Sequence, residues 1–219
     1  MGGGNSDDRE LKALQAAGTN RDREAVLGDL FAEQRGRLRR MVDLRMDPRL
    51  KGRIDASDVL QEAWLEISAR LEDYLRDPRM PFRLWVRFIA GQKLLGLYRH
   101  HVGTQKRDAR RQRTLAPALG PEASSVAVAH HLVASGTTPT GFAVKRELHA
   151  QLVDALEGMD PLDREVLVLR HFEQLGNRDV AAVLDIGQTA ASNRYVRALE
   201  RLRGLLTPQP DPEPKGGDA

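Results

Sequence analysis

The sequence contains no cysteine. Disulfide bonds, thiolate catalysis and cysteine-ligated zinc are therefore excluded by chemistry. No apolar run approaches the roughly 20 residues needed to cross a bilayer, and the first residues, MGGGNSDDRE, have neither the basic segment nor the apolar core of an export signal. We expect a cytoplasmic protein that does not enter a membrane.

Aromatic residues are also scarce, at 5% of the 219 residues, whereas charged residues make up 30%. This balance favours compact helical bundles over a broad sheet, and the length suits two small domains. The sequence therefore predicts an all-α fold of two small helical domains joined by a flexible linker. The expected parts are a disordered extension over 1–20, a first domain over 21–113, the linker over 114–141, a second domain over 142–206 and a disordered, proline-rich tail over 207–219.

The stretch 175–203 predicts two helices joined by a tight turn, which is a helix-turn-helix. Asp185 can adopt the left-handed conformation of the turn at modest cost, and Gly187 can begin the next helix. Apolar residues at helical spacing give the second helix one buried stripe, formed by Ala191, Tyr195, Ala198 and Leu202.

The opposite arc of this second helix carries side-chain types that suit a DNA groove. Arg pairs with guanine, Asn with adenine, and small hydroxyl residues allow close approach to the bases. An ordinary solvated helix face is the alternative, since exposed Arg and Asn are common. The arc consists of Thr189, Ser192, Asn193, Val196 and Arg197, flanked by Arg194 and Arg201.

An earlier helix begins at 55–58, where Asp or Ser can cap free backbone N–H groups. Its outward face combines acidic and amide side chains with one apolar residue: Asp58, Gln61, Glu62 and Glu66 surround Leu65. This face is either a solvated surface with one stray Leu or an acidic docking surface with a hydrophobic centre.

A further amphipathic helix is expected over 82–99, after a loop over 72–81, and it leads into a basic stretch over 99–113. Aromatic residues beside so many cations could stack on unpaired bases. Aromatic residues at helical spacing are more often core residues, so both interpretations stay open.

The paired histidines His100–His101 and His130–His131 do not predict a metal site. Adjacent helical residues point apart, and no carboxylate cluster accompanies either pair. No nucleophile, general base or metal constellation suggests catalysis, so we expect neither a cofactor nor an enzyme.

Two stretches, RIDASDVLQEAWLEI followed by FRLWVRFIAGQKLLGLYR, and MDPLDREVLVLRHFEQLGNRDVAAVLDIGQTAASNRYVRALERLR, together resemble an extracytoplasmic-function sigma factor of bacterial RNA polymerase, in the sigma-70 superfamily. The resemblance covers residues 22–113 and 142–206. It is specific, because the helix with the Asp-x-x-Gln-Glu pattern (Asp58, Gln61, Glu62) and the helix-turn-helix are independent signals.

The resemblance implies a factor that binds core RNA polymerase and directs promoter recognition, melting and transcription initiation. Core polymerase and promoter DNA are the implied partners, and whether an anti-sigma protein also binds is left open. The implied polymerase contacts are Asp58, Gln61, Glu62 and Leu65. The implied contacts with the proximal promoter element are Tyr74, Phe82, Trp85, Gln92, Arg99, Lys106 and Arg107, and those with the distal element are Thr189, Ser192, Asn193, Arg194 and Arg197.

Two other classes compete with this interpretation. A helix-turn-helix regulator that never enters polymerase would explain the second domain but not the Asp58 helix. A helical enzyme acting on nucleic acid would need clustered catalytic carboxylates beside the basic stretch, which the sequence lacks.

Overall fold

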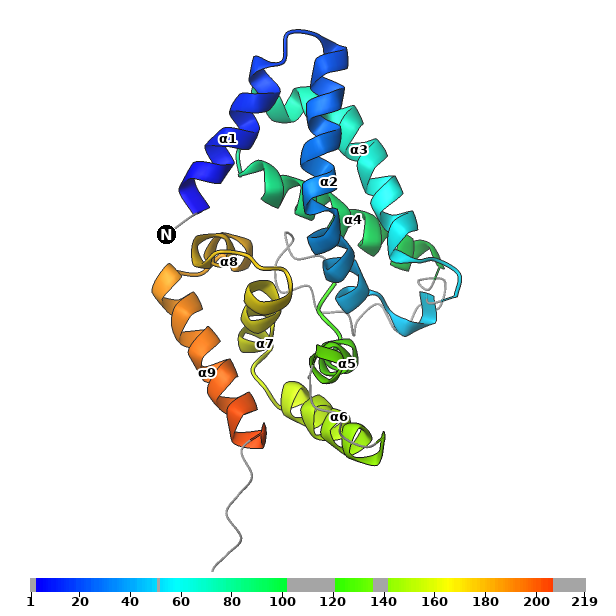
Figure 1. Ribbon diagram of the computed structural model, residues 1–219, viewed down its shortest axis with the longest axis vertical. Coiled ribbons are helices and arrows are strands. Elements are labelled where there is room, and N and C mark those ends of the chain that lie inside the picture. Colours follow the sequence, from blue (N-terminus) through cyan, green and yellow to red (C-terminus); the bar gives the residue numbers. More distant parts are fainter. Residues whose placement is uncertain (1–2, 51, 102–120, 136–141, 207–219) are drawn as a thin grey trace, which may run out of the picture.

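The structure is a computed structural model that describes residues 3–50, 52–101, 121–135 and 142–206. These residues form α-helices joined by short turns, as the all-α prediction requires (Figure 1). The helices are α1 (Gly3–Ala16), α2 (Asn20–Arg45), α3 (Ala56–Arg76), α4 (Phe82–His101), α5 (Ser125–Ser135), α6 (Phe142–Glu157), α7 (Pro161–Leu167), α8 (Asn177–Leu184) and α9 (Gln188–Leu206), with a 3-10 turn η1 (Pro48–Leu50) and a π-helical turn η2 (Val168–Phe172).

Helices α1 to α4 pack around one hydrophobic core, which forms the first domain. The start of α3 follows from a reciprocal capping box: the Asp55 carboxylate accepts from the N–H of Asp58, and the Asp58 carboxylate accepts from the N–H of Asp55. Helix α2 begins with a Thr19 side chain that accepts from the N–H of Asp22. The expected helix over 82–99 is confirmed as α4 (Phe82–His101).

The expectation of a disordered stretch over 1–20 is wrong for the part that the structure describes. Helix α1 spans Gly3–Ala16, with Leu14 fully buried in the first core and Leu11 packed against it. These two leucines are three residues apart and therefore share one helix face. Sequence reasoning gave too much weight to the glycine-rich start and too little to this apolar pair.

Helices α5 to α9 form the second domain, and α5 lies within the stretch that was predicted to be a linker. Residues 121–135 belong to the predicted linker over 114–141, yet Ala123, Val128 and Ala129 are buried in the second core. These residues form the helix α5 (Ser125–Ser135), which packs mainly on α6. This part is therefore a packed element and not a flexible connection; residues 102–120, 136–141 and the predicted tail lie outside the described residues.

The helix-turn-helix of α8 and α9 has the predicted turn. Asp185 adopts the left-handed conformation, with φ 54° and ψ 47°, a region that Asp tolerates better than most residues. The N–H of Ile186 then donates to the carbonyl of Ala181 at 3.0 Å, which closes the end of α8. Along α9, Ala191, Ala198 and Leu202 are buried and Tyr195 is half-buried, so the predicted stripe is confirmed.

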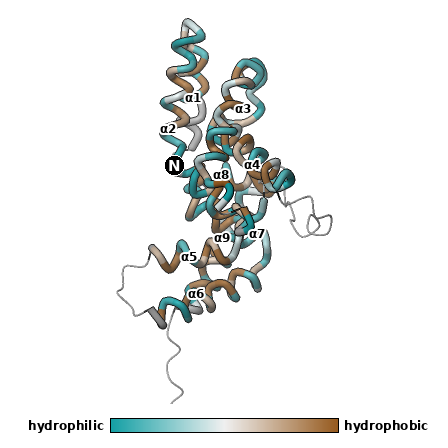
Figure 2. The backbone as a smooth tube through the Cα atoms, turned by 90° about the vertical axis from the view of Figure 1, so that its right-hand side faces the viewer, coloured by the Kyte–Doolittle hydropathy of each residue, from teal (hydrophilic) through white to brown (hydrophobic). Residues whose placement is uncertain are grey.

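The two domains lie against each other, with α8 and the η2 turn facing α2 and α4 (Figure 1). Two apolar side chains of the first domain are buried among residues of the second: Leu44 of α2 joins the core of α5, α6 and α9, and Leu84 of α4 joins the core of α8. The chain alternates between hydrophobic and hydrophilic residues along each helix (Figure 2). This amphipathic pattern leaves an apolar stripe on each helix for packing.

Within the described residues, none of the helices has the length and apolar character to cross a membrane. The same residues contain no group of three or more His, Asp or Glu side chains arranged to hold a metal ion.

Candidate functional site

The outward face of α3 is exposed where the sequence placed a docking surface. Asp58, Gln61 and Glu62 are exposed, and Leu65 is 58% exposed, an unusual position for a large apolar side chain. Asp58 has a second role because its carboxylate also caps the helix. Of the two acidic residues, Glu62 is therefore the one whose replacement leaves the helix start intact.

A groove of about 420 Å³ adjoins this face between α2 and α3. Its apolar wall is made by Phe31 and Trp64, whose rings meet edge to face at 5.1 Å, and Gln61 belongs both to the groove and to the docking face. Sequence analysis did not predict the groove, because Phe31 and Trp64 come from different helices and each fits its own helical stripe.

The other end of the exposed face is fixed by an ion pair. Lys93 of α4 donates to the Glu66 carboxylate at 2.8 Å. The hydrogen bond and the positive charge of Lys93 hold the pKa of Glu66 below its ordinary value. Glu66 is thus engaged within the domain, and the acidic face that remains open is the part around Leu65.

The aromatic residues expected to stack on unpaired bases are instead packed together inside the first domain. Phe82 is fully buried, Tyr74 and Trp85 are 5% and 7% exposed, and the rings of Tyr74 and Trp85 stack at 4.3 Å. The Tyr74 hydroxyl donates to the carbonyl of Met80, and burial raises its pKa to about 12. A base cannot stack on these rings in this conformation, which corrects the assignment of Tyr74, Phe82 and Trp85 to DNA contact.

Other predicted contacts of the proximal element remain available. Gln92 and Arg99 are exposed on α4, and residues 77–79 of the loop before α4 are exposed as well. That loop is shorter than expected, because α3 continues to Arg76 and includes Tyr74. Lys106 and Arg107 lie outside the described residues.

The predicted arc of α9 faces solvent. Thr189, Ser192 and Asn193 are exposed, and Val196 is 51% exposed. The helix is held from behind by α7, since the two elements pack closely. The arc is therefore presented as a free surface on a supported helix, which is the geometry that major-groove contact requires.

Two arginines at the edge of this arc are anchored by α7. Arg194 donates to Asp163 at 2.6 Å and to Asp160 at 3.1 Å, and Arg197 donates to Asp163 at 3.2 Å. Arg194 is largely covered, whereas the Arg197 side chain is 59% exposed. The structure therefore makes Arg194 a support of the helix and leaves Arg197 able to reach DNA.

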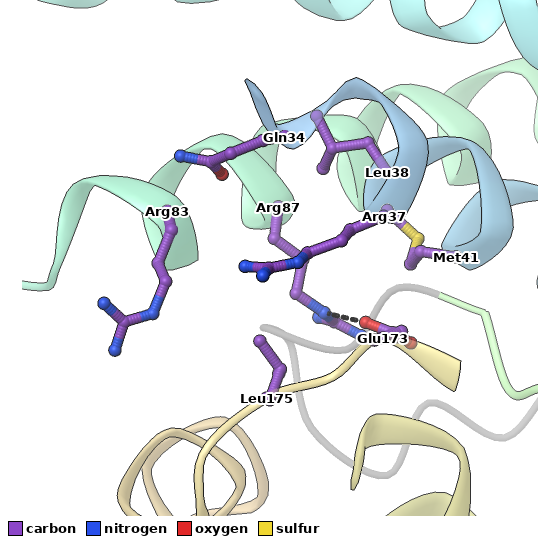
Figure 3. Close-up of a pocket in the computed structure, with 8 residues that line it drawn as sticks. All are labelled: Gln34, Arg37, Leu38, Met41, Arg83, Arg87, Glu173 and Leu175. Carbon is purple, nitrogen blue, oxygen red and sulfur yellow. Dashed lines mark hydrogen bonds and ion pairs between the residues drawn. The ribbon is translucent and has the colours of Figure 1, made fainter. Parts of the chain in front are cut away.

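A cluster of charges between the domains was missed by sequence analysis. Arg45 of α2 donates to Glu165 at 2.7 Å and also pairs with Glu173, and Arg87 of α4 donates to Glu173 at 2.6 Å. All four side chains are at most 4% exposed. Figure 3 shows Arg87 reaching from α4 to Glu173, and Arg83 projecting from the same helix one turn earlier.

In this cluster, burial and ion pairing shift the pKa values of the charged groups in opposite directions. Burial raises the pKa of Glu173, but the charges and hydrogen bonds of Arg45 and Arg87 outweigh it, and the pKa lies below its ordinary value. Burial lowers the pKa of Arg45, and Glu165 and Glu173 reverse this effect and raise it. Both groups are therefore charged at neutral pH.

A second interdomain pair lies beside this cluster. Arg83 of α4 donates to both carboxylate oxygens of Asp179 on α8, each at 2.7 Å. The cavity between α2, α4 and Glu173 measures about 20 Å³, little more than the space of one water. The interface is thus closely packed, and its charged contacts are ion pairs between arginine and carboxylate groups.

Comparison with known proteins supports the predicted family. The family model described as "Sigma-70, region 4" matches residues 149–202. The RNA polymerase sigma-E factor of Streptomyces antibioticus is 41% identical over 57 residues, which is 26% of this chain and only 32% of that protein. The RNA polymerase sigma factor CnrH of Cupriavidus metallidurans is 30% identical over 201 residues, which is 91% of this chain and 94% of that protein.

A solved structure described as CnrH in complex with the cytosolic domain of CnrY covers 91% of this chain and 97% of that chain, at 24% identity and a TM-score of 0.49. The sequence relationship to CnrH extends over both domains and both sets of predicted contacts. The chain therefore belongs to the RNA polymerase sigma factors of the sigma-70 superfamily, in the extracytoplasmic-function group that its sequence resembles.

Proposed function

We propose that this sigma factor docks on core RNA polymerase through the open face of α3, formed by Asp58, Gln61, Glu62 and Leu65. The observation that carries the proposal is the exposure of Leu65, at 58%, inside a ring of acidic and amide side chains. A large apolar residue surrounded by charges is typical of the centre of a protein interface. The adjoining groove with Phe31 and Trp64 extends the same surface.

The second part of the proposal assigns promoter DNA to two helices. Thr189, Ser192, Asn193 and Arg197 of α9 would read the distal element in the major groove, because they share one exposed arc. Gln92 and Arg99 of α4, with the exposed loop over 77–79, would contact the proximal element as it melts. Most of α4 packs in the core of the first domain and α9 packs in the second domain, so that each domain carries one of the two helices.

In this proposal the protein acts in the cytoplasm as a binding factor, and the chemistry of transcription belongs to polymerase. An anti-sigma protein as a further partner stays a prediction from the family resemblance.

Replacement of Glu62 by Lys tests the docking surface. Charge reversal at the rim of Leu65 should weaken binding to purified core polymerase by roughly tenfold or more, because like charges placed against each other cost several kcal/mol. Asp73→Lys is the matched control: it makes the same change at an exposed residue of α3 about three turns away.

Co-elution on size exclusion and a fluorescence titration measure the binding. Equal affinity of wild type and Glu62→Lys would refute the docking surface. If the unchanged protein itself failed to bind polymerase but bound a specific duplex, a regulator that acts without polymerase would be the better description.

A further inference from the structure

One carboxylate of α7 holds two arginines of α9. Oδ1 of Asp163 accepts from Nη1 of Arg194 at 2.6 Å and from Nη2 of Arg197 at 3.2 Å. Asp163 is only 8% exposed, and the two arginines are three residues apart, so they share one face of α9. A negative charge therefore lies at the edge of a surface that is proposed to meet DNA, where the phosphates favour positive charge.

The place of this carboxylate is fixed by the start of α7. Pro161 stands in the first turn of the helix, and the Asp160 side chain caps that turn. Val166 and Leu167 bury the apolar side of α7 among the cores of the second domain. Asp163 is thus carried by a packed helix with a capped start, and its side chain is a fixed support for the arginines that reach it.

The two arginines are held to different degrees. Arg194 donates to a second carboxylate, that of Asp160, at 3.1 Å, and its side chain is 23% exposed. Arg197 donates to Asp163 through Nη2, and its side chain remains 59% exposed. Asp163 therefore covers one side of the Arg197 guanidinium group and leaves most of the side chain open to solvent.

The contact with Asp163 leaves Arg197 able to read a base. A guanidinium group carries five N–H donors in a planar fork, and two edges of the fork present two donors each. Nη2 has one hydrogen on each edge, so its bond to Asp163 uses one edge and leaves both donors of the other. Two parallel donors are what the O6 and N7 acceptors of guanine require. Arg197 can therefore bind Asp163 and a guanine at the same time.

The same cluster is poorly suited to bind phosphate. The charges of Arg194 and Arg197 are balanced by those of Asp160 and Asp163 within one set of ion pairs. Attraction to the DNA backbone comes from uncompensated positive charge, and it acts on every sequence alike. A balanced cluster at the edge of the arc adds little to this attraction, so the contribution of Arg197 must come from its geometry.

Resting on the function proposed above, we propose that Asp163 is a positioning residue for sequence-specific contact: it holds Arg197 ready for a base edge and keeps it from the phosphates. A side chain that is already held loses less rotamer freedom on binding. The Asp163 charge also repels a phosphate that approaches Arg197. Both effects favour the preferred duplex over any other, and together they make Asp163 a determinant of specificity that does not touch DNA.

Asp163→Asn tests this role, with Asp160→Asn as the matched control. Both variants remove one negative charge from the same cluster with little change of shape. Asp160 holds Arg194, whereas Asp163 holds both arginines. Asn is also a good helix cap, so the control keeps the start of α7. In Asp163→Asn, Arg194 keeps its bond to Asp160, and the support of α9 by α7 is retained.

Fluorescence anisotropy compares two DNAs, with the full chain alone and bound to core polymerase. One is a short duplex that wild type enriches from a random-sequence library, and the other is a scrambled duplex of the same composition. Asp163→Asn should lower the ratio of the two affinities by about threefold to tenfold, the effect of releasing one flexible side chain, mainly through tighter binding of the scrambled duplex. Asp160→Asn should change both affinities by the same factor and leave the ratio as in wild type.

The salt dependence separates positioning from a general loss of structure. Each new phosphate contact steepens the slope of log affinity against log salt by about 0.9. Asp163→Asn should therefore steepen the slope on the scrambled duplex, whereas a loosened helix would weaken both complexes without steepening it. In an Arg197→Ala background, Asp163→Asn should no longer change the ratio, since it acts through Arg197.

Equal ratios for folded Asp163→Asn and Asp160→Asn would overturn the role of Asp163, and so would an unchanged effect of Asp163→Asn in the Arg197→Ala background. Circular dichroism establishes that each variant is folded. If Asp163→Asn is unfolded, Asp163→Ser removes the same charge and has the same expected result. Failure of the proposed function has a different signature: wild type would enrich no sequence from the library, or would not bind core polymerase.

Discussion

Helices α4 and α9 are the two helices assigned to promoter DNA, and the fold presents them in opposite ways. Helix α9 needs one buried stripe, formed by Ala191, Ala198 and Leu202, and the arc opposite this stripe is open. Helix α4 is packed on several sides, with Phe82 in the core of the first domain and Leu84 in a core of the second. Amphipathic periodicity alone does not distinguish these two situations.

The difference shows what fixes the accessibility of a helix. A helix that packs on one layer keeps a continuous open arc, as α9 does against α7. A helix placed between two domains loses that arc, and its polar residues must then find partners within the chain. On α4, Arg83 pairs with Asp179 and Arg87 pairs with Glu173. The N-terminal half of α4, with Arg83 and Arg87, is therefore covered by the second domain, whereas Gln92 and Arg99 further along the helix stay exposed.

The largest difference between α4 and α9 is expected in how much a substitution on each helix lowers the free energy of unfolding. Phe82→Ala removes a fully buried ring from the first domain and should lower the free energy of unfolding by about 3–5 kcal/mol. Val196→Ala on α9 removes an apolar side chain that is 51% exposed, and the change should stay within about 0.5 kcal/mol. Urea unfolding followed by circular dichroism measures both. A near-neutral Phe82→Ala with weakened DNA binding would return Phe82 to the base-contacting set.

Local sequence features predicted the elements well. The start of α3 follows from its capping residues, and the courses of α4 and α9 follow from apolar spacing, signals that act within one or two turns. The end of α3 was predicted too early, since the helix continues to Arg76. The turn of the helix-turn-helix follows from Asp185, since a left-handed residue is needed there. The exposed faces around Leu65 and Asn193 follow from the same periodicity, because the residues opposite a buried stripe face solvent.

Contacts between distant segments could not be predicted in the same way. Arg45 and Glu165 are separated by 120 residues, and Arg83 and Asp179 by 96. In the sequence each looks like an ordinary charge on an amphipathic helix, and nothing local identifies its partner. The burial of Tyr74 and Trp85 depends likewise on how α3 meets α4. Sequence analysis therefore identified helices and open faces but not which face another domain covers.

A smaller effect should test the open arc of α9. Arg197→Ala should lose about 1–3 kcal/mol on the preferred duplex and much less on a scrambled one, the signature of a base contact. Because Arg197 already donates to Asp163 at 3.2 Å, it must share or exchange that partner on DNA, which favours the lower end of this range. Fluorescence anisotropy at fixed salt measures both affinities. Equal loss on the two duplexes would assign Arg197 to the phosphate backbone.

The smallest expected effect concerns the charges that cover α4. Glu173 has a pKa below its ordinary value, because Arg45 and Arg87 outweigh its burial. A carboxyl group with a depressed pKa stabilises the paired state at every pH above its unpaired pKa, and this contribution is lost only as the pH falls through the depressed value. The contact between the two domains at Glu173 should therefore be equally stable at pH 8 and pH 5 and weaken only in stronger acid.

Two dyes can follow the contact between the two domains in solution, since the chain has no native cysteine to compete for them. Ser68→Cys on α3 and Glu200→Cys on α9 place labels at exposed residues of the two domains, and the energy transfer between them reports their separation. A change in transfer between pH 7 and pH 6, where a carboxyl group of depressed pKa stays charged, would contradict control by Glu173, whereas a change confined to pH values below about 4 is the result that Glu173 predicts.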